Sequence, residues 1–194
     1  MMIPQTILVT RRQNLAEHMV PNTILVLFAS ETVYRNADVE YHFRQDSNFW
    51  YLTGFDEPNA VLVIRKDKNA QVEEWLYVQK REREKETWTG IRAGTEGAKE
   101  ITSIEQVKAW DEFESDFPTF MKECEVCYFD IEGNSFRELR RRLTSTIEDC
   151  SIKVIASTVL LRELRLYKDA WEIEQMRKAA NISVLAHKRA VQLM

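Results

Sequence analysis

The stretch TILVLFAS at residues 23–30 decides the fold class of this chain. It is a short, continuous apolar run that is β-branched at its start, which is typical of a strand buried on both faces of an α/β sheet. The runs AVLVIRK (60–66) and EEWLYVQ (73–79) enclose a polar turn and predict a β-hairpin. Further apolar runs predict strands at 125–130 and 152–156. The expected sheet is therefore mixed, with parallel and antiparallel strands.

Helical periodicity is found on either side of these strands. The predicted helices cover residues 4–19, 111–123, 135–147, 157–167 and 169–194. In the first helix the apolar residues recur near helical spacing, which places Arg11 and Arg12 on the surface. A short strand is expected at 50–54, and a short helix with an exposed loop is expected at 80–103. This order of elements predicts an α/β fold, in which a mixed β-sheet is flanked by helices.

The composition is that of a folded chain without a surplus of positive charge. Among 194 residues there are 27 Lys and Arg against 31 Asp and Glu, a net charge of −4, and 44% of the residues are apolar. By size scaling, such a chain buries roughly 70% of the surface that its unfolded form exposes, so its core needs no disulfide or metal. The charge argues against a nucleic-acid partner. No run reaches the ~20 apolar residues that cross a membrane, so no membrane association is expected.

The N-terminus and the cysteines indicate a cytoplasmic protein. The opening segment has neither a basic stretch ahead of an apolar run nor a small-residue cleavage pattern, so no secretory signal is expected. The spacing of the 3 cysteines suggests no disulfide framework, and reduced thiols are expected. Cys124 and Cys127 form a C-x-x-C pattern in a strand-like run, where residues three apart point to opposite faces. Core cysteines are therefore favoured over a redox or zinc site.

Other motifs assign no catalytic residue and no metal ligand. The spacing of Gly90, Gly94 and Gly97 matches neither the dinucleotide fingerprint nor the phosphate-binding loop. The predicted helix at 135–147 is basic, and a solvated helix face is favoured there over a phosphate site. Its arginines are Arg137, Arg140, Arg141 and Arg142.

The densest signal lies in residues 34–58, where aromatic and charged residues alternate. The aromatic residues include Tyr41, Phe43, Phe49, Trp50, Tyr51 and Phe55, and the charged residues among them include Arg35, Asp38, Arg44 and Asp46. Two interpretations stay open. The segment is either an edge of the core whose charges brace a loop, or an interface or substrate wall built from aromatic anchors.

Three stretches resemble the aminopeptidase P family, the Xaa-Pro aminopeptidases. They are RNADVEYHFRQDSNFWYLTGFDEPNAVLVI (35–64), WTGIRAGTEGA (88–98) and LRELRLYKDAWEIEQMRKAANISVLAHKRA (161–190). The resemblance implies the mixed-sheet α/β N-terminal domain of aminopeptidase P and creatinase, with a ribonuclease H-like topology, over residues 1–168. It also implies that residues 169–194 are the first helix of a pita-bread catalytic domain.

The resemblance further implies a cytoplasmic, oligomeric metallopeptidase, a hydrolase that releases an N-terminal residue preceding proline. Such an enzyme uses two divalent metal ions, usually manganese, held by its catalytic domain. No catalytic residue and no metal ligand are therefore expected within 1–194, and this chain alone is expected to be inactive. The implied partners are its own catalytic domain, neighbouring subunits and a peptide with proline at the second position. The N-terminal domain then contributes oligomerisation and restricts substrate access.

Five residues match motif positions that the family implies are close to the substrate. Trp88 begins the W-x-G-x-R-x-G pattern and is implied to reach a neighbouring subunit's substrate pocket, where its ring can cover a prolyl ring. The other four are Asp38, Tyr41, Arg44 and Arg92. For these four, a network that only braces the loop stays an equal alternative.

Two alternatives to this function remain open. One is a free-standing module that binds a peptide or partner without catalysis, and the other is the equivalent domain of a prolidase. The predicted helix at 169–194 has no stop signal, so the chain is expected to continue into a longer protein or to pack on a partner.

Overall fold

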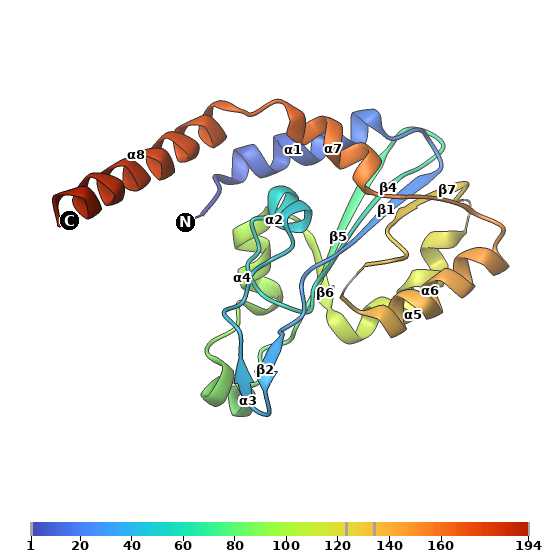
Figure 1. The fold of residues 1–194 in the computed structure, drawn as a ribbon. Coiled ribbons are helices and arrows are strands. Elements are labelled where there is room, and N and C mark those ends of the chain that lie inside the picture. The colour runs from blue at the N-terminus through green and yellow to red at the C-terminus, as the bar shows by residue number, and fades with distance from the viewer. Residues whose placement is uncertain (1, 123, 134, 194) are drawn as a thin grey trace. The chain divides into compact units, whose positions relative to one another are not determined.

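The structure is a computed structural model that describes residues 2–122, 124–133 and 135–193, without the side chains of Lys85, Trp88 and Thr89 (Figure 1). The chain divides into two compact units, Met1–Leu161 and Arg162–Met194. The domain boundary predicted between residues 168 and 169 stays a prediction.

A mixed sheet of 6 strands forms the first unit, in the order β6-β5-β4-β1-β7-β8. Its strands are β1 (Thr23–Phe28), β4 (Val61–Lys66), β5 (Val72–Val78), β6 (Gln106–Ala109), β7 (Val126–Phe129) and β8 (Lys153–Ile155). β4 is antiparallel to β1 and β5, and the other neighbouring pairs are parallel. This confirms the predicted α/β fold with a mixed sheet. Because only β4 runs in the opposite direction, the carboxyl ends of the other strands lie at one edge of the sheet.

Helices cover both faces of the sheet (Figure 1). On one face lie α1 (Gln5–His18), α2 (Ser47–Thr53) and α4 (Gly94–Thr102), and on the other lie α5 (Phe113–Met121) and α6 (Arg137–Asp149) (Figure 1). The chain also forms α3 (Arg83–Thr89) after β5 and α7 (Thr158–Leu166) after β8. A 3-10 turn, η1 (Trp110–Glu112), precedes α5, and a small hairpin of β2 (Tyr34–Asn36) and β3 (Val39–Glu40) follows β1. The predicted helices at 4–19, 111–123, 135–147 and 157–167 correspond to α1, α5, α6 and α7.

The alternation of side chains in β1 produces two hydrophobic layers. All residues of β1 are buried, as predicted for its apolar run. Val26 packs with Val63 and Phe129 in the core cluster that includes residues of α5 and α6. Leu25, the residue before Val26, is also buried and by strand alternation points to the opposite face. Helices α1, α2 and α4 cover that face (Figure 1). Burying each such aliphatic side chain contributes about 1.5–3 kcal/mol to stability. Because β1 contributes buried side chains to both layers, it is the central strand of the fold.

The predicted strand at 50–54 is wrong, because these residues belong to α2. The carboxylate of Asp46 accepts hydrogen bonds from the backbone N–H groups of Asn48 and Phe49, both at 2.9 Å, and so caps the helix. Gly54 ends the helix with a left-handed φ of 63°. The two caps outweigh the aromatic and β-branched content that suggested a strand.

Two further details differ from the prediction. Residues 80–103 contain two helices, α3 and α4, rather than one helix and an exposed loop. The short edge strand β6 was not predicted, because its sequence QVKA is polar and has no apolar run. In the second unit, α8 (Ala170–Gln192) begins as predicted: Asp169 accepts a hydrogen bond from the Glu172 N–H at 2.8 Å, and the Glu172 carboxylate accepts one from the Asp169 N–H at 3.1 Å.

The predicted surface position of Arg11 and Arg12 is also wrong, since both are buried. The guanidinium of Arg12 is 1% exposed and pairs with the Glu74 carboxylate at 2.8 Å. It also donates to the backbone oxygens of Leu52 at 2.9 Å and Thr102 at 3.0 Å. The buried guanidinium charge is tolerated because one carboxylate and two backbone oxygens accept its hydrogen bonds. Arg12 thereby ties α1 to α2, α4 and β5.

We predict that Arg12→Met lowers the free energy of unfolding by about 3 kcal/mol, because it removes a buried charge and leaves its acceptors without partners. Urea unfolding measures this loss. Arg142→Met is the matched control, because Arg142 pairs with Glu114 at 2.7 Å but is 47% exposed, and it should cost about 1 kcal/mol or less. Equal losses in the two variants would contradict the assigned role of Arg12.

Candidate functional site

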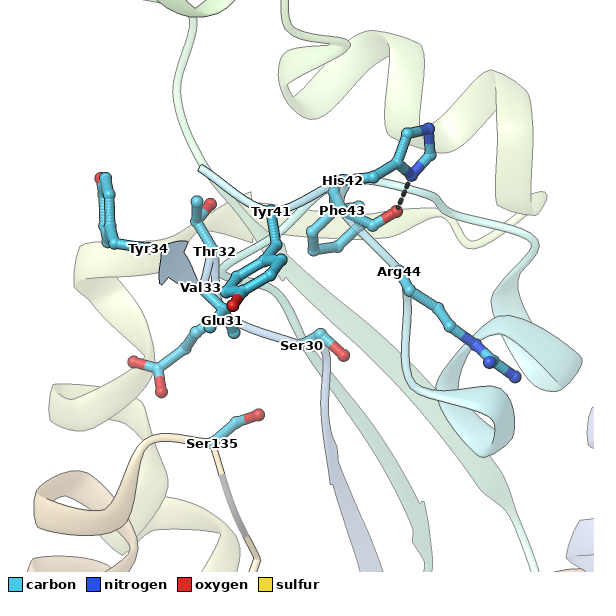
Figure 2. Close-up of a pocket in the computed structure, with 10 residues that line it drawn as sticks. All are labelled: Ser30, Glu31, Thr32, Val33, Tyr34, Tyr41, His42, Phe43, Arg44 and Ser135. Atoms are coloured by element: carbon cyan, nitrogen blue, oxygen red, sulfur yellow. Dashed lines mark hydrogen bonds between the residues drawn. The ribbon is translucent and has the colours of Figure 1, made fainter. Parts of the chain in front are cut away.

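A groove opens at the sheet edge where β1 ends (Figure 2). Its volume is about 700 Å³, and its walls come from residues 30–34, residues 41–44 and Ser135. Ligands of open α/β sheets bind outside the carboxyl ends of the strands. The groove is therefore the first place to look for a function among the described residues.

Two exposed tyrosine rings and the guanidinium of Arg44 line this groove. Tyr34 is 58% exposed and Tyr41 is 56% exposed. Glu31 and Arg44 point in opposite directions (Figure 2). The Glu31 carboxylate accepts the Phe136 N–H at 2.7 Å, whereas Arg44 makes no ion pair with any described residue. The groove therefore offers two phenol rings and one guanidinium to a ligand.

Gln45, directly after this wall, is buried and uses all of its side-chain hydrogen-bonding capacity. Its Nε2 donates to the backbone oxygens of Phe55 at 3.1 Å and Glu57 at 2.8 Å. Its Oε1 accepts the backbone N–H groups of Ser30 at 2.7 Å and Asp46 at 2.9 Å. One side chain thus joins the end of β1, the start of α2 and the loop before β4.

Arg140 contradicts the prediction of a solvated helix face, because only 7% of this residue is exposed. Its Nε donates to the Ser135 oxygen at 2.7 Å, another of its nitrogens donates to the Asp130 oxygen, and its Cζ lies 4.6 Å from the centre of the Phe28 ring. Burial lowers the pKa of this guanidinium. A Cβ at Gly133 would come within 2.4 Å of it, so the glycine makes room. Its neighbours Arg137, Arg141 and Arg142 are exposed, as predicted.

The second motif, residues 88–94, runs from the last residues of α3 to the first residue of α4. Trp88 is in α3, and its side chain is outside the described part of the structure. Gly90 ends α3 with a φ of 87°, and Arg92 is half-buried. Gly94 has a φ of 63° and starts α4.

The structure brings some of the predicted residues together. Tyr41 and Arg44 share the groove. Asp38 is exposed in the turn between β2 and β3, and it is not among the residues that line the groove. Trp88, in α3, and Arg92, in the loop that follows it, are not among the residues that line the groove. The assignment of these five residues to a substrate site stays a prediction.

No group of three or more His, Cys, Asp or Glu side chains lies close enough to hold a metal ion in the described part of the chain. The three cysteines are free thiols. Burial raises the pKa of the Cys124 thiol to about 11, and Cys127 is buried in the core. A protonated thiol is a poor nucleophile, so Cys124 and Cys127 have a packing role. No described helix has the length and hydropathy needed to cross a membrane.

The family model and the similar proteins found by comparison agree on one family. Residues 8–128 match the family described as "Aminopeptidase P, N-terminal domain". The chain is 33% identical to the Xaa-Pro aminopeptidase of Escherichia coli (strain K12) over 94% of its length, and 35% identical to that of Haemophilus influenzae over 94%. It spans 43% and 41% of these two proteins, less than half of their length.

Solved structures agree. Aminopeptidase P from E. coli in its low-pH form superposes with a TM-score of 0.89 at 31% identity, covering 98% of this chain and 45% of that one. Proline aminopeptidase P II from Yersinia pestis gives a TM-score of 0.87 at 31% identity, covering 97% of this chain and 45% of that one. Other E. coli structures contain the inhibitor Pro-Leu, or substituted zinc together with product.

We predict that Gln45→Glu lowers the free energy of unfolding by about 2–4 kcal/mol. The carboxylate keeps both acceptor bonds but cannot donate to the oxygens of Phe55 and Glu57, which then lose their partner. Gln79→Glu is the same chemical change at a half-buried side chain with a single bond, to the Pro58 oxygen at 3.0 Å, and it should cost about 1 kcal/mol. Urea unfolding compares the two, and a larger loss at Gln79 would show that Gln45 is not the anchor.

Proposed function

The chain belongs to the aminopeptidase P N-terminal domain family, and on that premise we propose that it is the non-catalytic N-terminal domain of an Xaa-Pro aminopeptidase. The observation that carries this proposal is the alignment with the E. coli enzyme, which includes 94% of the chain at 33% identity. That enzyme's name supplies the substrate class, a peptide whose second residue is proline. The inhibitor Pro-Leu in the E. coli structure is the peptide that remains when the first residue is released from X-Pro-Leu, which is in keeping with this class.

The chemistry is proposed to lie in a catalytic domain beyond these residues. The family likeness suggests two divalent ions there, usually manganese, which would supply an activated hydroxide for attack on the scissile carbonyl. The described residues of this chain form no cluster of ligands for such ions. On the same likeness, residues 169–194 are proposed to begin the catalytic domain, and residues 1–168 are proposed to shape the approach of the substrate.

The groove and the 88–94 loop are the surfaces we assign to the substrate and to neighbouring subunits. Tyr41 and Arg44 offer an aromatic ring and a cation at the groove, and Asp38 is exposed in the turn of the β2–β3 hairpin. Trp88 and Arg92 are assigned to the wall of the peptide site, where an aromatic ring covers proline by apolar contact. The exposed apolar side chains of Val33, Tyr34 and Val39 suit contact with another subunit of an oligomer. Free thiols are in keeping with a cytoplasmic location.

We predict selective cleavage of X-Pro-Y tripeptides by the protein that contains this chain and its catalytic domain. With manganese, release of the first residue should be at least about a hundredfold faster from X-Pro-Y than from X-Ala-Y, because a site shaped for proline discriminates by a few kcal/mol. Chromatography of the products measures the rates. The 194-residue chain alone is the control and should release nothing. Preferential cleavage of an X-Pro dipeptide would instead indicate a prolidase, and turnover by the chain alone would place the metal site here.

We also predict that Trp88→Ala in the same protein lowers kcat/KM for X-Pro-Y by about tenfold, which corresponds to roughly 1.4 kcal/mol of lost aromatic contact. Trp88→Phe keeps a ring and should retain most of the activity. The Tm should change little in either variant. A normal kcat/KM in Trp88→Ala would remove Trp88 from the site.

A further inference from the structure

Two carboxylates hold consecutive backbone amides of the loop that follows α3. The Glu57 Oε1 accepts the Ala93 N–H at 2.7 Å, and the Glu86 Oε1 accepts the Arg92 N–H at 3.3 Å. Hydrogen bonds from amides to ionised carboxylates are stronger than bonds between neutral groups. The backbone on both sides of the Arg92 carbonyl is therefore fixed from two directions.

Glu86 provides the local half of this arrangement. Its carboxylate is 8% exposed and accepts from Arg81 Nε at 3.0 Å and Nη2 at 3.2 Å. The same arginine holds the pKa of Glu86 below its ordinary value. The Arg81 side chain lies against Gly94, where an added Cβ would be 2.6 Å from its Cγ. Only glycine leaves this space, and Gly94 also has a φ of 63°.

Glu57 provides the long-range half, because it belongs to the loop before β4. Its backbone oxygen accepts from Gln45 Nε2 at 2.8 Å, and the next residue, Pro58, accepts from Gln79 at 3.0 Å. Burial raises the pKa of the Glu57 carboxyl, while the bond to Ala93 and the charge of Arg92 oppose that shift. The half-buried Glu57 carboxyl group thus meets the Ala93 N–H and lies near the charge of Arg92.

Glu57 connects the two sequence motifs physically. Gln45 follows the groove wall at 41–44 and holds the backbone of Glu57, and the Glu57 side chain holds Ala93. Two hydrogen bonds, from Gln45 to the Glu57 backbone oxygen and from Ala93 to the Glu57 carboxylate, therefore connect the groove wall to the loop. Neither bond belongs to a helix or a sheet ladder.

We propose that Glu57 is a positioning residue, which fixes the loop of Trp88 and Arg92 relative to the groove wall that carries Tyr41 and Arg44. This inference rests on the proposed function, because it assigns the two segments to one peptide site. Glu57 does not touch the peptide. It keeps the loop in one conformation, so that substrate binding does not have to order the loop.

The test compares Glu57→Ala, Glu57→Gln and Glu105→Ala in the protein that contains this chain and its catalytic domain. Alanine removes the acceptor, whereas the glutamine carbonyl retains it. Glu105 is an exposed glutamate before β6 and serves as the matched control. Hydrogen exchange of the peptides covering residues 88–94, followed by mass spectrometry, reports the loop, and the kinetics on X-Pro-Y report the site.

In Glu57→Ala we expect exchange of residues 88–94 to accelerate about five- to tenfold, as for the loss of one charge-assisted hydrogen bond. KM should rise by about the same factor while kcat stays within about twofold, because a disordered loop weakens binding of substrate and transition state alike. Glu57→Gln should restore both values substantially. Glu105→Ala should change neither.

Unchanged exchange in Glu57→Ala would overturn the inference. Faster exchange with an unchanged KM would also overturn it, because the loop would then be held without serving the site. A third outcome is that the unsubstituted protein cleaves no X-Pro peptide while hydrogen exchange responds as expected. The proposed function and the substrate role of Glu57 would then both be wrong, and only the structural role of the contact between Glu57 and Ala93 would be supported.

Discussion

The side-chain amide of Gln45 is the interaction on which the functional edge of this protein depends. It satisfies two donors and two acceptors of the backbone, at Ser30, Asp46, Phe55 and Glu57. These groups lie in segments that belong to no common helix or strand, so no regular structure could pair them. An unpaired buried backbone group costs about 1–3 kcal/mol. A single glutamine therefore allows the chain to leave β1, form an exposed wall and return to β4.

Buried polar side chains take the same part elsewhere in the first unit. Arg12 holds α1 against α2 and α4, and Arg140 closes the turn between β7 and α6. Each donates mainly to backbone oxygens at the ends of regular elements. The apolar strands build the layers of the fold, while these polar groups determine how the loops leave the sheet.

The predictable part of the fold comes from apolar periodicity. The strands β1, β4, β5, β7 and β8 follow from apolar runs, and α1 and α6 follow from stripes at helical spacing. Periodicity gave the wrong element at α2, where the Asp46 cap and Gly54 decide the structure. It also gave the wrong position for Arg11, Arg12 and Arg140, because a periodic pattern assigns every charged residue to the surface. In the site, aromatic density marked Tyr41 and its neighbours. Gln45 and Glu57 were missed, because their partners are distant in sequence and no local pattern reveals them; only their place inside a long, specific motif could have drawn notice.

We propose that the protein's work is divided between two places: metal chemistry in a downstream domain, and control of substrate access by the groove wall and the 88–94 loop. The most direct test is a crystal structure of the protein that contains this chain and its catalytic domain, with Pro-Leu bound. The account predicts that side chains of the 88–94 loop, in its own or a neighbouring subunit, lie within about 4 Å of the peptide, the range of van der Waals contact, with the Ala93 N–H still bonded to Glu57. A peptide bound away from both this loop and the groove would contradict it.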